Sequence, residues 1–252
     1  MFEIFILSVL QGITEFIPVS SSSHLILASD FFDIKFKSLA IDVSLHIGSF
    51  LAVVLYFYKD IILFFKNKKI LIFGIIASTP LIFIGFILVY FKLIDHLRSV
   101  EIIAITTILF GVLLFWSDKQ DTTKDIKNDF DFKTAVIIGL FQTLALIPGV
   151  SRSGIVITIS RFLNFNRIEA TKISFLISIP TLAAVSFYGL NTIHSSNDIL
   201  FSKVNFLSIV GSFIISYLTI KYFLIFLKRF SLTLFVVYRI LLGLILIKYV
   251  YF

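Results

Sequence analysis

Long apolar stretches alternate with short polar segments along the chain, and six of the stretches are long enough to cross a membrane. A spanning helix needs about 20 mostly apolar residues. The six stretches are 41–58 with an extension to Phe65, 70–91, 101–117, 170–190, 204–227 and 231–252. This pattern predicts an all-α polytopic membrane protein with six transmembrane helices.

Two further apolar stretches, 2–29 and 134–160, are interrupted by polar residues, glycine and proline. The interruptions are Gln11, Glu15, Pro18, four successive serines and His24 in the first, and Gln142, Pro148, Gly149 and Ser151-Arg152-Ser153 in the second. Irregular polar backbone at membrane depth is tolerated only where protein buries it or water reaches it. We therefore expect each stretch to form a re-entrant helix–loop–helix hairpin. A signal peptide is the alternative at the N-terminus, but Glu3 and Glu15 lie inside the stretch and no basic residue precedes it.

The composition narrows the class of protein further. Hydrophobic residues make up 58% of the chain and charged residues 15%, and the mean hydropathy is +1.04. Because soluble domains carry about 25% charged residues, these values exclude a water-soluble enzyme, a disordered protein and a fibrous repeat. The absence of cysteine excludes disulfides, thiolate metal sites and cysteine nucleophiles. The net charge is +7. Membrane proteins carry excess Lys and Arg in their cytoplasmic loops and next to anionic lipid headgroups, so nucleic acid is not an expected partner.

Basic residues in the loops predict the orientation of the spans. If the six spans alternate and each hairpin returns to its own side, one side collects thirteen Lys and Arg residues and the other collects six. The side with more basic residues faces the cytoplasm. This assignment places residues 66–69 and 118–133 in the cytoplasm, and it places residues 191–203 and both termini outside.

The polar segment 118–133 is a linker that divides one membrane domain, residues 1–252, into the halves 1–117 and 134–252. At an offset of 130 residues, Glu15-Phe-Ile-Pro18 aligns with Ala145-Leu-Ile-Pro148, and Phe57-Tyr58 aligns with Phe187-Tyr188. Because the two hairpins are expected to enter from opposite sides, the halves form an inverted repeat. Inverted repeats with broken helices place a polar site near the membrane midplane.

The first hairpin carries a dense polar motif that runs from Gln11 to His24. Gln11 and Glu15 are four residues apart and share one helix face. Pro18 ends that helix, and the following serines form a turn that can present hydroxyls and backbone N–H groups to an anion. A charged residue at a helix centre in the bilayer costs about 2.5–3.5 kcal/mol. Glu15 is therefore expected to face a polar cavity, a cation or a proton partner, the alternative being a capped helix with a snorkelling glutamate.

The second hairpin carries the motif Pro148-Gly-Val-Ser-Arg-Ser-Gly154. Arg152 lies between two apolar runs and is not an anchor at the end of a loop. A guanidinium flanked by small hydroxyl and glycine residues suits bidentate recognition of phosphate. An intramembrane salt bridge to Glu15 is the alternative, and both roles can hold in the empty protein.

The two motifs, in this order and at this spacing, resemble the undecaprenyl-diphosphate phosphatase family, also called the bacitracin-resistance protein family. The resemblance covers the full length, including the stretch from Lys228-Arg229 to Tyr238-Arg239. It implies hydrolysis of undecaprenyl diphosphate to the monophosphate, which recycles the lipid carrier of bacterial cell-wall synthesis. It also implies a multi-pass protein of the bacterial plasma membrane with a site open to the outer face. The expected cofactor is a divalent cation, Mg²⁺ or Ca²⁺.

The expected partners are a polyprenyl diphosphate lipid and the bilayer, with a homodimer left open. The resemblance implies that the catalytic residues are Glu15, Ser21, His24 and Arg152, and that Glu15 binds the cation. The substrate-binding residues are predicted to be Gln11, Ser20, Ser22, Ser151, Ser153 and Gly154. The sequence departs from the family at two positions. Gln11 stands where many members have glutamate, which removes a second carboxylate ligand, and Ser23 replaces the usual glycine before His24.

These residues allow a mechanism to be drafted. Arg152 and the serine-rich turns hold the diphosphate and neutralise the charge that develops during transfer. Ser21 or a water attacks the terminal phosphorus and His24 moves the proton, while His24 as the nucleophile stays open. Glu15 binds the cation or orients His24. Asp42 and His46, four residues apart in the first span, are expected to be structural.

A transporter of a polyprenyl phosphate is the alternative from a different class. Inverted repeats, broken helices and an arginine at the midplane suit transport as well as catalysis. Ser21 together with His24 discriminates between the two, because transport needs neither a nucleophile nor a general base.

Overall fold

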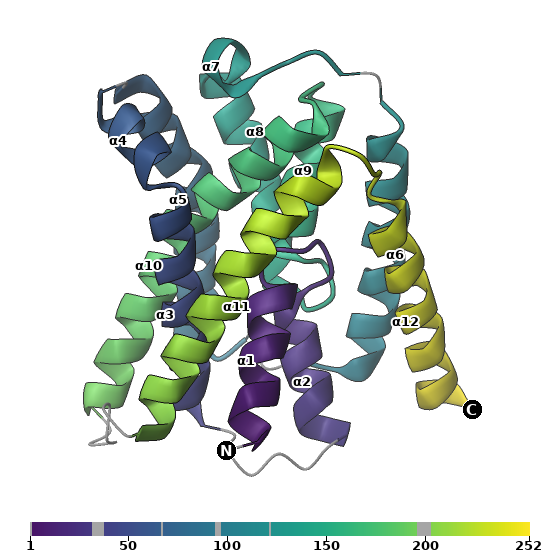
Figure 1. Cartoon of the computed structure of the whole chain (residues 1–252). Helices are drawn as coiled ribbons and strands as arrows, with labels where there is room; N and C mark the ends of the chain where they lie inside the picture. The colour runs from purple at the N-terminus through teal and green to yellow at the C-terminus, as the bar shows by residue number, and fades with distance from the viewer. Residues whose placement is uncertain (1, 32–37, 67, 94–96, 121, 196–202) are drawn as a thin grey trace.

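The computed structural model describes residues 2–31, 38–66, 68–93, 97–120, 122–195 and 203–252, and it confirms the all-α class (Figure 1). No β-strand occurs in these ranges. The helices are α1 (Phe2–Thr14), α2 (Ser21–Phe31), α3 (Leu39–Tyr56), α4 (Tyr58–Lys66), α5 (Lys68–Tyr90), α6 (Val100–Asp118), α7 (Ile126–Asp129), α8 (Phe132–Gln142), the 3₁₀ helix η2 (Thr143–Leu146), α9 (Arg152–Phe162), α10 (Arg167–Ser195), α11 (Lys203–Leu227) and α12 (Thr233–Tyr251).

Six helices are long and apolar enough to span a membrane, and they coincide with the six predicted stretches. They are α3, α5, α6, α10, α11 and α12. The first span differs from the prediction, because α3 ends at Tyr56 and the expected extension to Phe65 forms the separate helix α4. The break falls at Phe57, where ψ is 17°, and the charged pair Lys59-Asp60 follows immediately. Charges at this point favour a change of direction towards water over a longer apolar helix.

The six long helices alternate in direction, and both chain termini lie at the same end of the bundle (Figure 1). Helix α7 and the segment that precedes it lie at the opposite end (Figure 1). The predicted outer segment 191–203 lies partly outside the described residues, but the start of α11 at Lys203 is at the end that holds the termini.

The two interrupted stretches form two shorter helix pairs. α1 and α2 pack side by side at the end of the bundle that holds the termini, and α8 and α9 pack together at the opposite end (Figure 1). We call α1, the first turn (residues 15–20) and α2 the first hairpin. The second hairpin is α8, η2, the second turn (residues 147–151) and α9. Helix α1 packs on α11, whereas α9 packs on α10 and α6. The two turns meet in the interior, as hydrogen bonds between them show below.

Small side chains let α3 and α11 approach closely beside the first hairpin. A Cβ on Gly48 would lie 2.4 Å from the Ile209 carbonyl oxygen, so only glycine fits there. The buried hydroxyl of Ser49 lies 3.1 Å from that of Ser212 and 3.0 Å from that of Ser216. Glycine and serine at helix contacts are typical of membrane proteins, where close packing and interhelical hydrogen bonds hold helices together. The closely packed helices α3 and α11 thus lie next to the polar interior.

The linker is fastened to the second half by a buried ionic cluster. Asp118 accepts hydrogen bonds from Arg167 Nε at 2.5 Å and from the Leu232 backbone N–H at 2.9 Å. Arg161, which is 3% exposed, donates to the carbonyl oxygens of Asp118 at 2.9 Å and Gln120 at 2.7 Å. One carboxylate therefore joins the ends of α6, α10 and α12, so this end of the bundle is fixed even though its sequence is polar.

Candidate active site

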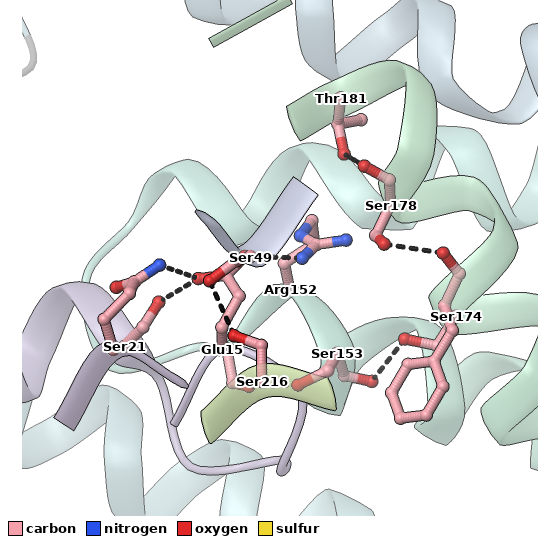
Figure 2. A network of polar contacts seen from close by, with 12 residues as sticks. Glu15, Ser21, Ser49, Arg152, Ser153, Ser174, Ser178, Thr181 and Ser216 are labelled. Carbon is pink, nitrogen blue, oxygen red and sulfur yellow. Dashed lines mark hydrogen bonds and ion pairs between the residues drawn. The ribbon is translucent and has the colours of Figure 1, made fainter. Parts of the chain in front are cut away.

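Glu15 is the centre of a polar cluster inside the bundle, and its side chain contacts three other site residues (Figure 2). Its Oε2 oxygen accepts hydrogen bonds from Ser21 Oγ at 2.6 Å and from Gln11 Nε2 at 3.1 Å. Its Oε1 oxygen accepts from Arg152 Nη2 at 2.6 Å. Glu15 is 7% exposed, and the Arg152 side chain is 14% exposed. Gln11 and Glu15 lie on one face, as predicted, and the Arg152–Glu15 salt bridge that was the alternative role of Arg152 is present.

The first turn places Ser21 against Glu15. Helix α1 ends at Thr14, and α2 begins at Ser21 directly after Ser20, which has a φ of +78°. Residues other than glycine avoid this region, and holding one there costs about 1–3 kcal/mol. The buried Ser20 hydroxyl lies 3.0 Å from the Ser23 hydroxyl, an interaction that supports the turn. The surrounding structure must offset this strain. Strained residues of this kind cluster at functional sites.

The second turn has the same geometry and places Arg152. Ser151 has a φ of +71° and caps α9 by accepting a hydrogen bond from the Gly154 N–H at 3.1 Å. Arg152 is therefore the first residue of α9, as Ser21 is the first residue of α2. The first side chain of each helix, Ser21 in α2 and Arg152 in α9, reaches the Glu15 carboxylate, and helix N-termini favour negative charge in their surroundings.

The two turns bind each other directly. The Gly149 N–H donates to Ser20 Oγ at 3.3 Å, and Ser153 Oγ donates to the Ile17 carbonyl oxygen at 3.0 Å. Gly149 has a φ of +92°, and a Cβ there would come within 2.0 Å of Thr106 Oγ1. This position therefore requires glycine for both its backbone conformation and its packing.

Arg239 on α12 joins both turns, a role that the sequence reasoning missed. It is fully buried. Its Nη1 donates to the Pro18 carbonyl oxygen at 3.1 Å, and its Nη2 donates to those of Gly149 at 2.7 Å and Val150 at 3.2 Å. Its Nε donates to the Thr107 carbonyl oxygen at 3.2 Å. The available signal was a single arginine in the middle of the last apolar stretch, because such a charge is costly unless it has a specific partner.

His24 contacts groups other than Ser21 in this arrangement. Its Nδ1 lies 2.7 Å from the Ser20 carbonyl oxygen, and its Nε2 lies 2.5 Å from the hydroxyl of Tyr238 on α12. The hydroxyl of Ser21 donates to Glu15 instead. Glu15 is thus the acceptor in place for the Ser21 proton, and His24 is held beside it by the backbone and by Tyr238.

The predicted substrate-binding residues fall into two groups. The hydroxyls of Ser20, Ser151 and Ser153 are buried and take part in hydrogen bonds within and between the turns. Gly154 is also buried, and a Cβ there would lie 3.0 Å from Arg239 Nη1. Ser22 is exposed, and Gln11 is buried. Ser22 and Gln11 form the second group, and they have more polar atoms left to bind a ligand than the first group has. The residues of the first group hold the turns in shape.

Two buried polar atoms at the centre have no hydrogen-bond partner within the described structure. They are Gln11 Oε1 and Arg152 Nη1. An orphaned buried polar atom costs about 1–3 kcal/mol. An amide oxygen is a cation ligand or an acceptor, whereas a guanidinium N–H suits a phosphate oxygen. Gln11 Oε1 and Arg152 Nη1 are therefore the candidate ligand contacts at the centre of the cluster.

No group of three or more His, Asp or Glu residues that could hold a metal occurs among the described residues. Glu15 and Gln11 Oε1 nevertheless supply two hard oxygen donors, which Mg²⁺ and Ca²⁺ prefer. Mg²⁺ is commonly bound through one or two carboxylates together with substrate phosphates. Both Glu15 oxygens already accept hydrogen bonds from Ser21, Gln11 and Arg152, so the donor set fits only a divalent cation that substrate oxygens complete.

Asp42 and His46 lie on α3, and His46 acts electrostatically on Glu15, so their structural role stays a prediction. The Nδ1 of His46 lies 2.8 Å from the Asp42 carbonyl oxygen, one turn earlier in the same helix. This hydrogen bond is local to α3.

Comparison with known proteins identifies relatives over the whole chain. The sequence model of the family described as bacitracin resistance protein BacA matches residues 4–245. A protein of Pelagibacter ubique (strain HTCC1062) named undecaprenyl-diphosphatase is 45% identical over 251 residues, which are 99% of this chain and 97% of the relative. A protein of Jannaschia sp. (strain CCS1) with the same name is 36% identical over 264 residues, covering 100% of this chain and 99% of the relative.

Proposed function

The chain belongs to the bacitracin resistance protein BacA family, and from this premise we propose that it is an undecaprenyl-diphosphatase. It hydrolyses undecaprenyl diphosphate to undecaprenyl phosphate and inorganic phosphate, and it thereby recycles the lipid carrier for cell-wall synthesis. The observation that carries the proposal is the convergence of Ser21 and Arg152 on Glu15. Ser21 and Arg152 are the first residues of α2 and α9 and Glu15 lies in the first turn, so a hydroxyl, a guanidinium and a carboxylate meet at one place, and together they suit phosphoryl transfer.

Arg152 and the N-termini of α2 and α9 bind the diphosphate. Arg152 Nη2 is engaged by Glu15, but Nη1 is free to donate to a phosphate oxygen without loss of the ion pair. The backbone N–H groups at both helix starts add fixed positive partial charge near the transferred group. This electrostatic stabilisation needs no reorganisation during the reaction, because Arg239 and the serine hydrogen bonds already hold the turns.

Ser21 attacks the terminal phosphorus and transfers its proton to Glu15, 2.6 Å away. A bond forms between Ser21 Oγ and phosphorus, the bridging P–O bond breaks, and undecaprenyl phosphate leaves. Water then attacks the phosphorus of the phosphoserine and gives a proton to the departing phosphate, the Oγ–P bond breaks, Glu15 returns its proton to Ser21 Oγ, and inorganic phosphate is released. His24 carries protons between the site and its surroundings. Direct attack by water and attack by His24 are the alternatives, and His24 is less suited because Tyr238 holds its Nε2.

Glu15 and Gln11 would hold a divalent cation, Mg²⁺ or Ca²⁺, together with phosphate oxygens. Such a cation would neutralise charge on the diphosphate. Gln11 brings no charge of its own, so this chain relies on a single carboxylate for the cation.

The site lies in an inverted repeat of two re-entrant hairpins, with the halves 1–117 and 134–252 joined by the cytoplasmic linker 118–133. The structure supports an offset of 131 residues between the hairpins, one more than the sequence alignment predicts. Ser20 and Ser151 have the same unusual φ and each precedes the second helix of its hairpin, and Gln11 and Gln142 occupy equivalent places in the first helices. The six spans make the protein a multi-pass membrane protein. Its membrane is the bacterial plasma membrane, and the site opens to the outer face.

The alternative of a polyprenyl phosphate transporter is less favoured. Both relatives are named as diphosphatases. A transporter would also have no use for a serine hydroxyl held 2.6 Å from a buried carboxylate. The assembly state, for which a homodimer stays open, does not affect the choice, because one chain supplies every residue of the cluster.

The test is release of inorganic phosphate from a polyprenyl diphosphate by the purified protein in detergent, with and without a chelator. Phosphate release that a chelator suppresses, and that Ser21→Ala protein lacks, supports the proposal. Transfer of polyprenyl phosphate across a vesicle membrane without phosphate release would favour the transporter.

A further inference from the structure

The tautomer of His24 follows from its two hydrogen bonds. Nδ1 lies 2.7 Å from the Ser20 carbonyl oxygen, which can only accept, so Nδ1 carries a hydrogen. In the neutral ring Nε2 is then an acceptor, and the Tyr238 hydroxyl donates to it at 2.5 Å. The hydrogen bond on one imidazole nitrogen fixes the protonation of the other. Ser20 and Tyr238 together therefore select one tautomer of His24.

Tyr238 also fixes the plane of the imidazole. The two rings are stacked, with centroids 5.7 Å apart and an interplanar angle of 15°. The next residue, Arg239, is fully buried and bound to the carbonyl oxygens of both turns, so α12 cannot shift relative to the site at this level. The backbone of Tyr238 is consequently held in place by the hydrogen bonds of its neighbour Arg239.

We propose that Tyr238 is a positioning residue for His24. Its hydroxyl keeps the imidazole in the Nδ1–H tautomer, so that Nε2 is the only ring nitrogen that gains or loses a proton. This inference rests on the proposed function. Nε2 is protonated through the Tyr238 hydroxyl, which gives its hydrogen to Nε2 and takes up a proton from water in exchange, and the hydroxyl oxygen then accepts a hydrogen bond from the imidazolium. The ring thus holds one orientation in both protonation states, and the added proton enters by way of the hydroxyl. No covalent bond between heavy atoms changes in this step.

The variant Tyr238→Phe tests the proposal, because it retains the stacked ring and removes only the hydroxyl. We expect kcat for phosphate release to fall about tenfold, the effect of one lost orienting hydrogen bond. KM should stay within about twofold, because Tyr238 does not contact the diphosphate-binding groups Arg152 and Ser22 in this arrangement. The matched control is Tyr249→Phe on the same helix, which packs on Phe31 and should leave both constants unchanged.

A spectroscopic measurement separates positioning from a general loss of packing. The chain has four histidines, and His24→Gln identifies the His24 signals in ¹⁵N spectra of the protein in detergent. Wild-type His24 should show the Nδ1–H tautomer, whereas Tyr238→Phe should show a substantial Nε2–H fraction, since the acceptor site at Nε2 is then unoccupied. Tyr249→Phe should give the wild-type spectrum.

Unchanged kcat in Tyr238→Phe would overturn the inference, and so would a fall in kcat with an unchanged His24 tautomer. A wild-type protein that releases no phosphate would overturn the proposed function instead. In that case the tautomer shift alone would still decide whether Tyr238 positions His24.

Discussion

Arg152 donates through Nη2 to Glu15 Oε1 over 2.6 Å, and this ion pair links the N-terminus of α9 to the end of α1, 137 residues away in the sequence. Both partners are mostly buried, with side-chain exposures of 14% and 6%. An ion pair of this kind holds the charges of the empty site in balance. It leaves Arg152 Nη1, which has no partner among the described residues, as the donor that the proposed phosphate contact uses.

Arg152→Lys is expected to separate charge from geometry. Lysine keeps the positive charge but loses the planar fork that can bind Glu15 and a phosphate at the same time. The loss of one strong charge-assisted contact should reduce kcat/KM by about two to three orders of magnitude. The measurement is steady-state phosphate release, with detergent-solubilised yield as the control for insertion. Near-normal turnover, or rescue by exchanging the charges of Arg152 and Glu15, would assign Arg152 to charge balance alone.

Ser21→Ala should lower phosphate release by at least about 10³-fold, as expected for removal of a nucleophile. The protein should still fold, since the turn is held by Ser20, Ser153 and Arg239. Ser29→Ala in the same helix is the matched control. If Ser21→Ala stays active while His24→Ala is inactive, direct attack by water or by His24 becomes the better mechanism.

Gln11→Glu should reduce the concentration of divalent cation needed for half-maximal activity by about tenfold, because it adds a second carboxylate next to Glu15. Activity would be measured against free Mg²⁺ and Ca²⁺ after treatment with a chelator. Gln11→Ala should shift the dependence in the opposite direction. An identical cation dependence in all three proteins would remove Gln11 from the cation site.

Single cysteines can test the orientation, because the chain has none. Asn128→Cys, in α7, should be protected from an impermeant thiol reagent in intact cells. Lys203→Cys, at the exposed start of α11, should react. The reverse pattern would place the linker outside and reverse the proposed topology.

Asp118→Ala should destabilise the protein without changing the chemistry of the site. Removing this carboxylate leaves Arg161 and Arg167 without a shared counter-ion and the Leu232 N–H without its acceptor. The cost of breaking such a buried pair is about 3 kcal/mol. The readout is the Tm in detergent, compared with Asp60→Asn, which alters an exposed carboxylate in α4. An equal Tm in the two variants would mean that the cluster contributes little.

The six spans could be predicted from the sequence because the length of an apolar run directly reflects the thickness of the bilayer. The breaks in the hairpins were equally visible, since Pro18 and Pro148 stand among serines and glycines inside apolar stretches. The pairing of Gln11 with Glu15 followed from helical spacing. Residues close together in the sequence determine all of these features, so the sequence alone predicts them.

The remaining part of the site depends on contacts between distant segments. Tyr238 lies 214 residues from His24, and the Arg239–Pro18 contact spans 221 residues. No periodicity connects such positions. The break after Tyr56 was also missed, because Phe57 and Tyr58 continue the apolar pattern and only backbone geometry reveals the change of direction. The buried arginine could have been singled out by its cost, but its partners could not, because they are backbone carbonyls.

Arg239 has a consequence for the biosynthesis of the protein. Its helix is synthesised after both hairpins, and its guanidinium binds the turns of those two hairpins. Until α12 enters the membrane, the carbonyl oxygens of those turns lack this donor, and His24 lacks Tyr238. A nascent chain that lacks α12 therefore carries both hairpins without the side chain that joins them. α12 must therefore be made and inserted before the two turns have all the hydrogen bonds that hold them together in the folded protein.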